Sequence, residues 1–396
     1  MVKPWDTATI GDFLDFKNGL NKGKEFFGYG TTIVNYTDVY KKRGLKKADI
    51  RGRVCLTLDE IHRFDVRKND VFFTRTSETP DEVGMSSVLL EDVENGVFSG
   101  FVLRGRPKND MFVPEYCKYC FSTEAVRNAI IAGCTYTTRA LTNGKQLSDI
   151  EIPVPPKPEQ EAIAAALSDI DALIVSLEKL IAKKKAIKQG AMQELLTGKR
   201  RLPGFGGDWA ECVLTDVADL MTDTIPVSDI DSRYYIGTDN MVSNRGGIKQ
   251  NRIELQYTVV RRYIVNDILL SNIRPYLKKI WFADTNGGCS SDVLVIRAKS
   301  DGKILAGFLY QLLSQNAFFD EVTANAVGTK MPRGDKNIIK TYPLYIPVDL
   351  GEQREILRIL AEMQIEVENL EENLNKYRQI KQGMMSELLT GRIRLL

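Results

Sequence analysis

Two stretches of the chain place apolar residues at alternating spacings of four and three. The positions are Ile163, Leu167, Ile170, Ile174, Leu177 and Ile181 in the first stretch, and Ile356, Leu360, Met363, Val367, Leu370 and Leu374 in the second. This spacing is the seam of a coiled coil, so each stretch is predicted to lie in one long helix. The first helix would run from Glu159 to Thr197, 39 residues or about 58 Å. Because a small domain cannot cover so long a seam, we expect the two helices to run antiparallel and to bury their seams against each other.

The second stretch repeats the first, and the repeat extends beyond the seam. The run QELLTGKRRL at 193–202 matches SELLTGRIRL at 386–395, and Glu159-Gln160 matches Glu352-Gln353 at the same offset of 193 residues. Weaker echoes precede each copy, such as NDVFFTR at 69–75 and NDILLSN at 266–272. Such a duplication predicts two globular domains that alternate with two helices.

Local signals predict how these helices begin and end. Asp349 with Glu352 matches the D-x-x-E form of a capping box at the start of the second helix. Each helix should stop at a glycine followed by basic residues, and the two are Gly198 and Gly391. Gly190 and Gly383 occupy the same place inside each helix, where glycine costs about 1 kcal/mol relative to alanine. This paired cost predicts a close backbone approach at both sites.

The segments outside the helices alternate short apolar runs with Gly, Asn and Asp turns. Strands are expected at 70–74, 97–103, 267–270 and 292–296, and helices at 114–132 and 304–322. The predicted fold is therefore α/β (α+β) in both globular domains, joined by two long antiparallel helices with a pseudo-twofold internal repeat. The predicted boundaries are 1–151 for the first domain, 152–202 for the first helical region, 203–345 for the second domain and 346–396 for the second helical region.

Composition and charge narrow the class of protein. Apolar residues make up 43% and charged residues 27%, which suits domains with buried cores. The longest uncharged stretch, 304–319, is too short and too polar to span a bilayer, and the first residues lack the apolar region of a signal peptide. The net charge of only +2 means that nucleic-acid binding would depend on local basic patches.

Metal and catalytic motifs are absent from the sequence. Cys117 and Cys120 form a CxxC without a second ligand pair, and the single histidine, His62, lies far away in sequence. Walker A, G-x-S-x-G and H-E-x-x-H patterns are missing, as is the Asn-Pro-Pro-aromatic motif of an amino-methyltransferase. We therefore expect no metal site and no catalytic residue in this chain.

Polar, basic and aromatic side chains gather instead in loops of both globular domains. Lysine and hydroxyl groups suit phosphate oxygens, while arginine and asparagine can bind two edge atoms of guanine and adenine. The candidate DNA-binding residues are Lys17, Asn18, Lys22, Lys24, Arg75, Thr76, Ser77, Tyr136, Arg139, Asn143 and Lys145 in the first domain, and Asn244, Arg245, Lys249, Asn272, Arg274, Tyr276, Lys330, Arg333 and Lys336 in the second.

The two repeated segments resemble the conserved regions of Type I restriction-modification specificity (S) subunits. Glu159-Gln160 followed by the first seam and the run LLTGKRRL at 195–202 is similar to the central region of that family, and the segment from Glu352 to 395 is similar to the distal one. The distal copy departs from the central one only slightly, with Gly351 in place of Pro158 and Arg392 in place of Lys199. The resemblance covers the whole order of domains.

This resemblance implies a non-catalytic, cytoplasmic subunit that chooses the DNA sequence. Each globular domain would be a target recognition domain that reads one half of a bipartite site in double-stranded DNA. The helix pair would set the spacer and dock two modification subunits, which carry S-adenosylmethionine and methylate adenine. Restriction subunits, which are ATP- and Mg-dependent, would translocate and cleave the DNA. The chain itself would bind no cofactor.

Two other classes of function remain open from the residues alone. One is a coiled-coil scaffold that binds only protein partners, which salt-dependent binding of duplex DNA would distinguish. The other is a glycosyl or phosphoryl transferase without a recognised motif, which activity of the isolated chain would reveal.

The repeat also predicts that the two chain ends lie close together. Trp209 follows Gly198 by 11 residues, and Trp5 would follow Gly391 by 10 if Leu396 were joined to Met1. Matched spacings around a duplicated helix pair are expected when the halves are related by an internal twofold axis.

Overall fold

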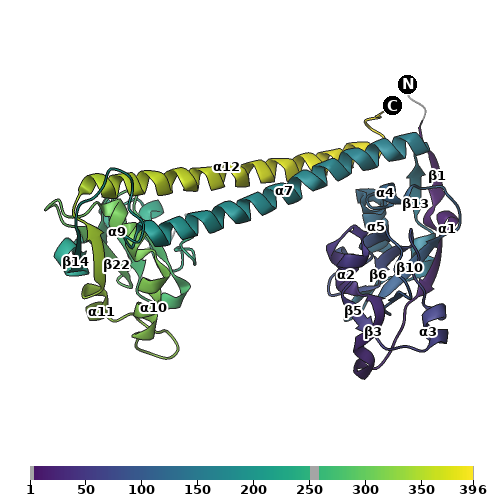
Figure 1. Cartoon of the computed structure of the whole chain (residues 1–396), viewed down its shortest axis with the longest axis horizontal. Helices are drawn as coiled ribbons and strands as arrows, with labels where there is room; N and C mark the ends of the chain where they lie inside the picture. The colour runs from purple at the N-terminus through teal and green to yellow at the C-terminus, as the bar shows by residue number, and fades with distance from the viewer. Residues whose placement is uncertain (1–3, 250–257, 396) are drawn as a thin grey trace. The chain divides into compact units, whose positions relative to one another are not determined.

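A computed structural model describes residues 4–249 and 258–395 of the chain, which divides into two compact units. The first unit comprises Met1–Lys179 and Glu371–Leu396, and the second comprises Leu180–Leu370. Each unit therefore contains one globular domain together with about half of each long helix (Figure 1).

The first domain is built on a five-stranded sheet. The strand order is β2 (Leu14–Asn18), β10 (Val102–Pro107), β6 (Val71–Thr74), β8 (Ser86–Leu89) and β4 (Gly44–Leu45). Smaller sheets are β5 (Gly52–Val54) with β3 (Phe27–Val34) and β9 (Val97–Phe98), β11 (Thr135–Tyr136) with β12 (Ala140–Leu141) and β7 (Thr76–Ser77), and β1 (Asp6–Thr9) with β13 (Glu151–Val154). The short helices are α1 (Ile10–Phe13), α2 (Tyr36–Lys41), α3 (Leu58–Arg63), α4 (Pro114–Cys117), α5 (Glu124–Gly133) and α6 (Gly144–Ser148).

The second domain repeats this plan with a four-stranded central sheet. Its order is β15 (Ala218–Met221), β22 (Val293–Ala298), β19 (Ile268–Ser271) and β20 (Ile280–Phe282), which matches β2, β10, β6 and β8. The other sheets are β16 (Thr224–Pro226), β18 (Val259–Tyr263), β21 (Gly287–Cys289) and β17 (Tyr235–Ile236), and β14 (Trp209–Val213) with β23 (Pro343–Pro347). Its helices are α8 (Leu214–Val217), α9 (Ala306–Leu313), α10 (Asn316–Ala324) and α11 (Lys336–Lys340). The predicted α/β class and internal repeat are confirmed.

Three of the predicted local elements are broken in the structure. The run at 97–103 is two strands, β9 and β10, because the chain bends at Ser99–Phe101 between them. The helix expected at 114–132 is α4, a 3-10 turn and α5, since the hydroxyl of Thr123 accepts from the amide of Val126 and starts a new helix. The helix expected at 304–322 is α9 followed by α10, with extended backbone at Gln315.

The echo between NDVFFTR and NDILLSN has a structural cause. Asp70 and Asp267 are both buried, and each accepts two hydrogen bonds from one guanidinium. The donor is Arg106 in the first domain, at 2.8 and 2.9 Å, and Arg297 in the second, at 2.7 Å for both bonds. The asparagine before each aspartate has a positive φ, 75° and 70°, which places the carboxylate in a tight turn. The repeated motif therefore holds the central sheet together.

The two long helices are α7 (Lys157–Leu195) and α12 (Leu350–Leu388), each of 39 residues. They lie side by side in Figure 1, and polar side chains join them within each unit. The pairs are Asp171–Lys381 and Glu178–Arg378 in the first unit, and Lys184–Glu366 and Lys188–Gln364 in the second. Partner numbers fall as α7 numbers rise, so the predicted antiparallel helix pair is confirmed.

The seams do not bury themselves only against each other. Ile163 and Leu167 lie in the core of the first domain, with Leu388 and Leu389 from the end of α12. Ile356 and Leu360 lie in the core of the second domain, with Leu195 and Leu196 from the end of α7. Of the remaining seam positions, Ile181 and Val367 are buried, and Ile170, Ile174, Leu177, Met363, Leu370 and Leu374 are half-buried. The helix ends are thus part of the domain cores.

A buried carboxylate joins the start of one long helix to the end of the other. In the first unit, Glu159 accepts from the indole of Trp5 at 3.0 Å and pairs with Arg394. In the second unit, Glu352 accepts from Arg201 at 2.7 and 2.8 Å and from the indole of Trp209 at 3.3 Å. We call these two groups of three the Glu-Arg-Trp clamps.

The second clamp overturns one prediction. Glu352 does not complete a capping box, because its carboxylate points to Arg201 and Trp209. Asp349 still caps the helix, but its side chain accepts from the amide of Gly351 at 2.7 Å in place of the Glu352 amide that the box requires.

The glutamine beside each clamp glutamate fastens the helix to its domain. Gln160 and Gln353 are fully buried. Gln160 donates to the carbonyls of Met111 and Pro155 and accepts from the amide of Val113, at 3.0, 2.8 and 2.8 Å. Gln353 makes the equivalent bonds to the carbonyls of Lys303 and Pro347 and from the amide of Leu305, at 2.9, 2.9 and 2.8 Å. These six bonds explain the repeated Glu-Gln pair.

The glycines behave in two different ways. Gly198 and Gly391 end their helices with φ of 70° and 71°, as predicted, and a Cβ at either would lie 3.1–3.2 Å from the clamp tryptophan ring. A Cβ at Gly190 or Gly383 would meet open space among the described residues. The predicted close approach at these two positions is therefore wrong within this chain.

The described parts of the two chain ends lie close together. The guanidinium of Arg394 lies 5.0 Å from the centre of the Trp5 ring. Met1 and Leu396, for which the proximity was predicted, lie outside the described residues.

Cys117 and Cys120 are both buried in the core of the first domain, and His62 is exposed. In the part of the chain that the structure describes, no helix combines the length and the apolar character that crossing a membrane requires.

Removing the clamp arginine should destabilise the first unit. Arg394→Ala would leave the Glu159 side chain, which is only 3% exposed, without its cation, and this should lower the free energy of unfolding by about 3–5 kcal/mol. Urea unfolding at pH 7 measures the loss. The control is Arg392→Ala, because Arg392 makes only an exposed pair with Glu387 and should cost at most about 1 kcal/mol. Equal losses for the two variants would contradict the clamp.

The same clamp should give the unit a defined acid sensitivity. The hydrogen bonds from Arg394 lower the pKa of Glu159 in the folded protein. The clamp therefore stabilises fully above the ordinary glutamate pKa of about 4.3, and this contribution is lost as the pH falls through the lower folded value. The stability difference between wild type and Arg394→Ala should shrink over that range, and a difference that stays constant down to pH 2 would argue against it.

Alanine at the two open glycines should stabilise the isolated chain. Gly190→Ala and Gly383→Ala should each raise the free energy of unfolding by up to about 1 kcal/mol, because alanine has the higher helix propensity and its Cβ meets nothing. Gly391→Ala is the control and should be destabilising, since the φ of Gly391 is positive and the added Cβ would lie 3.1 Å from the Trp5 ring. Thermal unfolding that shows losses at Gly190 or Gly383 would contradict this.

Candidate nucleic-acid interface

The structure brings two of the predicted loops of the first domain together. β7 pairs with β12, which pairs with β11, so Arg75–Ser77 lie beside the hairpin that carries Tyr136 and Arg139. The register joins Ser77 to Ala140 and Thr76 to Leu141. We call this three-stranded region the reading corner of the first domain.

The second domain forms the same corner with isolated bridges in place of strands. Arg333 bridges both Ile273 and Val327, so the loop after β19 lies beside the hairpin at 327–333. The amide of Arg274 donates to the carbonyl of Pro332 at 2.7 Å, which fastens the loop to the hairpin tip. The predicted residues Asn272, Arg274, Lys330 and Arg333 are thereby gathered at one place.

One exposed arginine at each corner, Arg139 and Arg333, is held by an ion pair at the surface. Arg139 lies 3.4 Å from Glu78, and Arg333 lies 2.9 Å from Asp292. Both guanidinium groups are exposed, and exposed pairs of this kind contribute about 0–1 kcal/mol. Either arginine can therefore exchange its carboxylate for a phosphate or a guanine edge at small cost.

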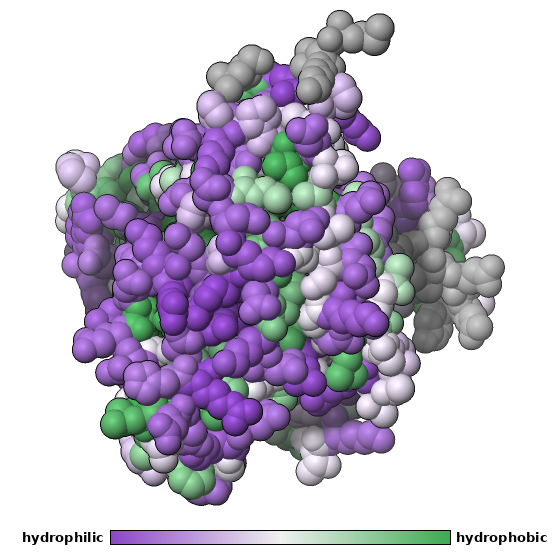
Figure 2. Space-filling model, turned by 90° about the vertical axis from the view of Figure 1, so that its right-hand side faces the viewer, coloured by the Kyte–Doolittle hydropathy of each residue, from purple (hydrophilic) through white to green (hydrophobic). Residues whose placement is uncertain are grey.

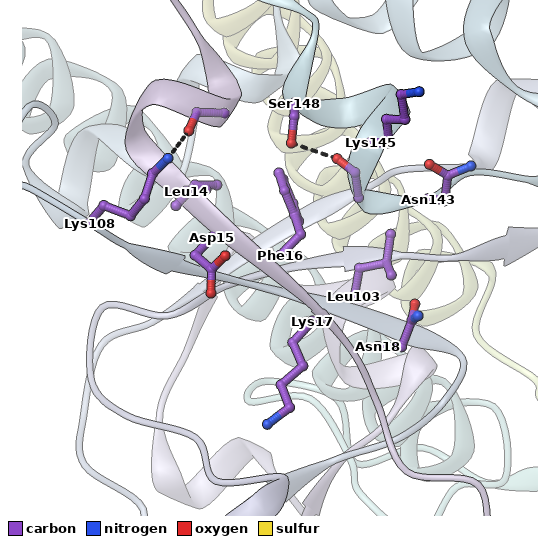
Figure 3. A pocket seen from close by; sticks show the side chains of 12 residues that line it. Leu14, Asp15, Phe16, Lys17, Asn18, Leu103, Lys108, Asn143, Lys145 and Ser148 are labelled. Carbon is purple, nitrogen blue, oxygen red and sulfur yellow. Dashed lines mark hydrogen bonds between the residues drawn. The ribbon is translucent and has the colours of Figure 1, made fainter.

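A basic cavity of about 530 Å³ lies between β2 and α6 in the first domain. It gathers the predicted residues Lys17, Asn18, Asn143 and Lys145, together with Lys108 (Figure 3). A cavity of about 410 Å³ occupies the equivalent place in the second domain, between β15, β22 and α11, and Lys336, Lys340 and Arg261 line it. Both domains thus carry a lysine-lined cavity beside the short helix that follows the reading corner.

Several predicted residues of the first domain are engaged in holding the fold. Lys22 pairs with Glu60 at 2.5 Å, and Ser77 is buried with its hydroxyl directed at Glu82. Lys17 donates to the carbonyl of Arg63 at 2.5 Å, and its partial burial lowers the pKa of the lysine.

Four further candidates of the first domain have mixed roles. The Asn143 side chain caps α6 by accepting from Gln146, and Arg75 is half-buried with its guanidinium 3.4 Å from the carbonyl of Gly100. Lys24 and Lys145 are exposed.

In the second domain, too, some candidates hold the fold and others are exposed. Arg245 donates to the carbonyl of Ser314 at 2.5 Å and to Asn316 at 2.7 Å, and burial lowers the pKa of its guanidinium. Asn272 is buried, and its side-chain oxygen has no hydrogen-bond partner among the described residues. The exposed candidates are Asn244, Lys249, Arg274, Tyr276, Lys330, Arg333 and Lys336.

Sequence reasoning missed the aromatic and acidic residues at the first corner. Tyr36, Tyr40, Phe101 and Glu82 line a cavity of about 440 Å³ with Arg139. The i, i+4 spacing of the two tyrosines on a polar helix is a signal that could have identified them. Phe101 could not be identified, because it lies within the run 97–103 that reads as one strand and only the bend at 99–101 exposes it.

The surface of the first unit is mostly polar (Figure 2), which suits binding of a polar ligand. Figure 2 shows that the visible face of the first unit is mostly hydrophilic, with hydrophobic residues in small separate patches. Within the described residues no group of three or more His, Cys, Asp or Glu side chains could hold a metal ion. The arrangement is suited to binding phosphate oxygens and base edges.

Comparison with known proteins gives a consistent result. A family model described as the Type I restriction modification DNA specificity domain matches residues 2–189 and 206–379. The specificity subunit of Type I restriction enzyme MjaVIII from Methanocaldococcus jannaschii is 24% identical over 430 residues, covering 99% of this chain and 93% of that protein. The EcoDI specificity subunit from Escherichia coli is 21% identical over 285 residues, and the match spans 62% of this chain and 63% of that protein.

Solved structures agree on the fold. The HsdS subunit from Thermoanaerobacter tengcongensis superposes with a TM-score of 0.57 at 16% sequence identity, covering 99% of this chain and 98% of that one. Because one family model matches both halves of the sequence, and both halves fold as the repeat requires, the chain belongs to the Type I restriction-modification DNA specificity family.

Proposed function

We propose that this chain selects the DNA target of a Type I restriction-modification complex, with one half of a bipartite site read by each domain. The observation that carries the proposal is the repeated reading corner, in which the loop after a central strand lies beside a hairpin in both domains but the exposed side chains differ. The proposed recognition domains are residues 1–151 and 203–345, and the helical regions are 152–202 and 346–396. Family membership does not favour a scaffold that binds only proteins.

The helix pair would set the spacer between the half-sites and dock the enzymatic subunits. The parts of α7 and α12 beyond the domain cores expose several large apolar residues, which soluble proteins commonly cover with partners. These are Leu173, Val175, Leu180, Ile187, Ile365 and Ile380. The partners would be two modification subunits with S-adenosylmethionine and the restriction subunits with ATP and Mg²⁺, acting on cytoplasmic DNA. The chain itself would supply no catalytic residue.

Substitutions at the two reading corners should change one half-site at a time. Arg139→Ala should relax the half read by the first domain, and Arg333→Ala only the other half, because a bidentate arginine contact provides about 1–3 kcal/mol of base discrimination. Sequencing of methylated sites in a host that carries the complex measures both halves. Arg51→Ala, an exposed arginine outside the corner, is the control. Equal relaxation of both halves by Arg139→Ala would refute separate reading.

Lengthening a helix should change the spacer and leave both half-sites intact. Four residues inserted after Leu177 add about 6 Å of helix. The methylated motif should then show an altered gap between unchanged halves. As a control, the same insertion after Gly206, where a side chain would meet open space, should preserve the gap. An unaltered gap in the helix variant would show that the helices do not determine the spacing.

A further inference from the structure

The cavity of about 440 Å³ at the reading corner of the first domain has aromatic walls. The Tyr36 and Tyr40 rings stack with their centres 5.7 Å apart and an interplanar angle of 15°. Phe101 lines the same cavity and is 57% exposed. None of the three belongs to a buried core cluster of the domain. Accessible aromatic rings around a cavity can stack on a planar ligand such as a base.

An anchored carboxylate lies among these rings. Glu82 accepts from the hydroxyl of Tyr40 at 2.7 Å and from the hydroxyl of Ser77 at 3.3 Å. The hydrogen bond to Glu82 raises the pKa of Tyr40, so the phenol remains a protonated donor. Because a carboxylate offers about four acceptor sites, two donors leave Glu82 with acceptor capacity toward the cavity.

The charge of this cavity does not suit phosphate. Two carboxylates, Glu78 and Glu82, line it beside the single guanidinium of Arg139. The lysine-lined cavity between β2 and α6 is the part of the domain that suits the DNA backbone. A carboxylate on a DNA-binding surface repels phosphates, but it can accept a hydrogen bond from the exocyclic amino group of cytosine.

Arg139 complements that carboxylate. Its guanidinium lies 3.4 Å from Glu78 in an exposed ion pair. Because such a pair is weak, the guanidinium can leave Glu78 and bind a base. In the major groove a guanine presents two acceptors, O6 and N7, which match the two donors of an arginine fork. The adjoining cytosine presents the amino donor that Glu82 can accept. One guanine–cytosine pair therefore satisfies both side chains at once.

We propose that this cavity reads one guanine–cytosine pair in the half-site of the first domain, with Arg139 binding guanine, Glu82 binding the cytosine amino group and Tyr40 positioning Glu82. The inference rests on the proposed function. The equivalent corner of the second domain exposes Val327 and Met331, and Val327 is 72% exposed. Apolar side chains suit a thymine methyl group and not an amino group, so the two domains present different chemistry at the same place.

The test uses the complete complex of this chain with its modification subunits, and methylated-site sequencing as the readout. Glu82→Gln keeps the shape of the side chain and an oxygen acceptor for Tyr40, but it removes the charge. One guanine–cytosine position in one half-site should lose its preference by roughly 5- to 150-fold. The other half and the spacer should stay unchanged. Tyr40→Phe should relax the same position to a smaller degree, because Glu82 then loses the donor that positions it.

The control is Glu94→Gln, since Glu94 is exposed in the same domain and does not line the cavity. Thermal unfolding of each variant establishes that the fold is retained. An unaltered motif in Glu82→Gln at normal methylation rates would overturn the inference, and so would a uniform fall in methylation with every position preserved. If the wild-type complex methylated no bipartite motif at all, the proposed function would fail, and this inference with it.

Discussion

A carboxylate that is nearly buried must be paired, and in this protein its partner comes from a distant segment of the chain. Glu159 pairs with Arg394, 235 positions later, and Glu352 pairs with Arg201, 151 positions earlier. Each clamp therefore closes only when the start of one long helix meets the end of the other. The clamp tryptophans lie against Gly198 and Gly391, where a side chain would be in the way. The antiparallel course of α7 and α12 follows from these contacts.

The two globular domains resemble each other more in their buried cores than on their exposed surfaces. Asp70 and Asp267 each bind one arginine of the neighbouring strand in the same geometry, and the strand order β2-β10-β6-β8 recurs as β15-β22-β19-β20. Burial allows few substitutions at such positions, because an unpaired carboxylate in the core would be costly. The exposed reading corners are free of that constraint. Tyr136 and Arg139 lie on the hairpin of the first corner, whereas the hairpin of the second corner carries Lys330 and Arg333 and is joined by isolated bridges in place of a sheet.

Basic character alone is a poor guide to a DNA-binding surface. Lys22 and Arg245 carry the charge that phosphate binding needs, but Glu60 and Ser314 already hold them. Arg139 and Arg333 remain available because both guanidinium groups are exposed and their surface ion pairs are weak. Whether a cation is already paired inside the fold or is free to bind DNA depends on its burial. The proposed DNA contacts are therefore those at the corners and at the lysine-lined cavities.

The sequence by itself determined the architecture of this protein. The 4-3 spacing of apolar residues defines a helix without reference to any neighbour, and the offset of 193 residues between the two copies establishes the internal repeat. Gly198 and Gly391 were recognisable as helix stops because a positive φ is a local requirement. The loops at Arg75–Ser77 and Tyr136–Arg139 could be nominated from residue type, and the structure places them side by side.

Only the tertiary structure decided which side chains act together. Glu352 reads locally as half of a capping box, but a distant arginine and tryptophan bind its carboxylate more favourably than the helix amides do. Gly190 and Gly383 read as sites of close contact and face open space within the chain. Phe101 reads as core and is exposed by a bend, while Glu82 is fixed beside the reading corner partly by Tyr40, 42 residues away. Pairing over such separations depends on packing, which no local spacing encodes.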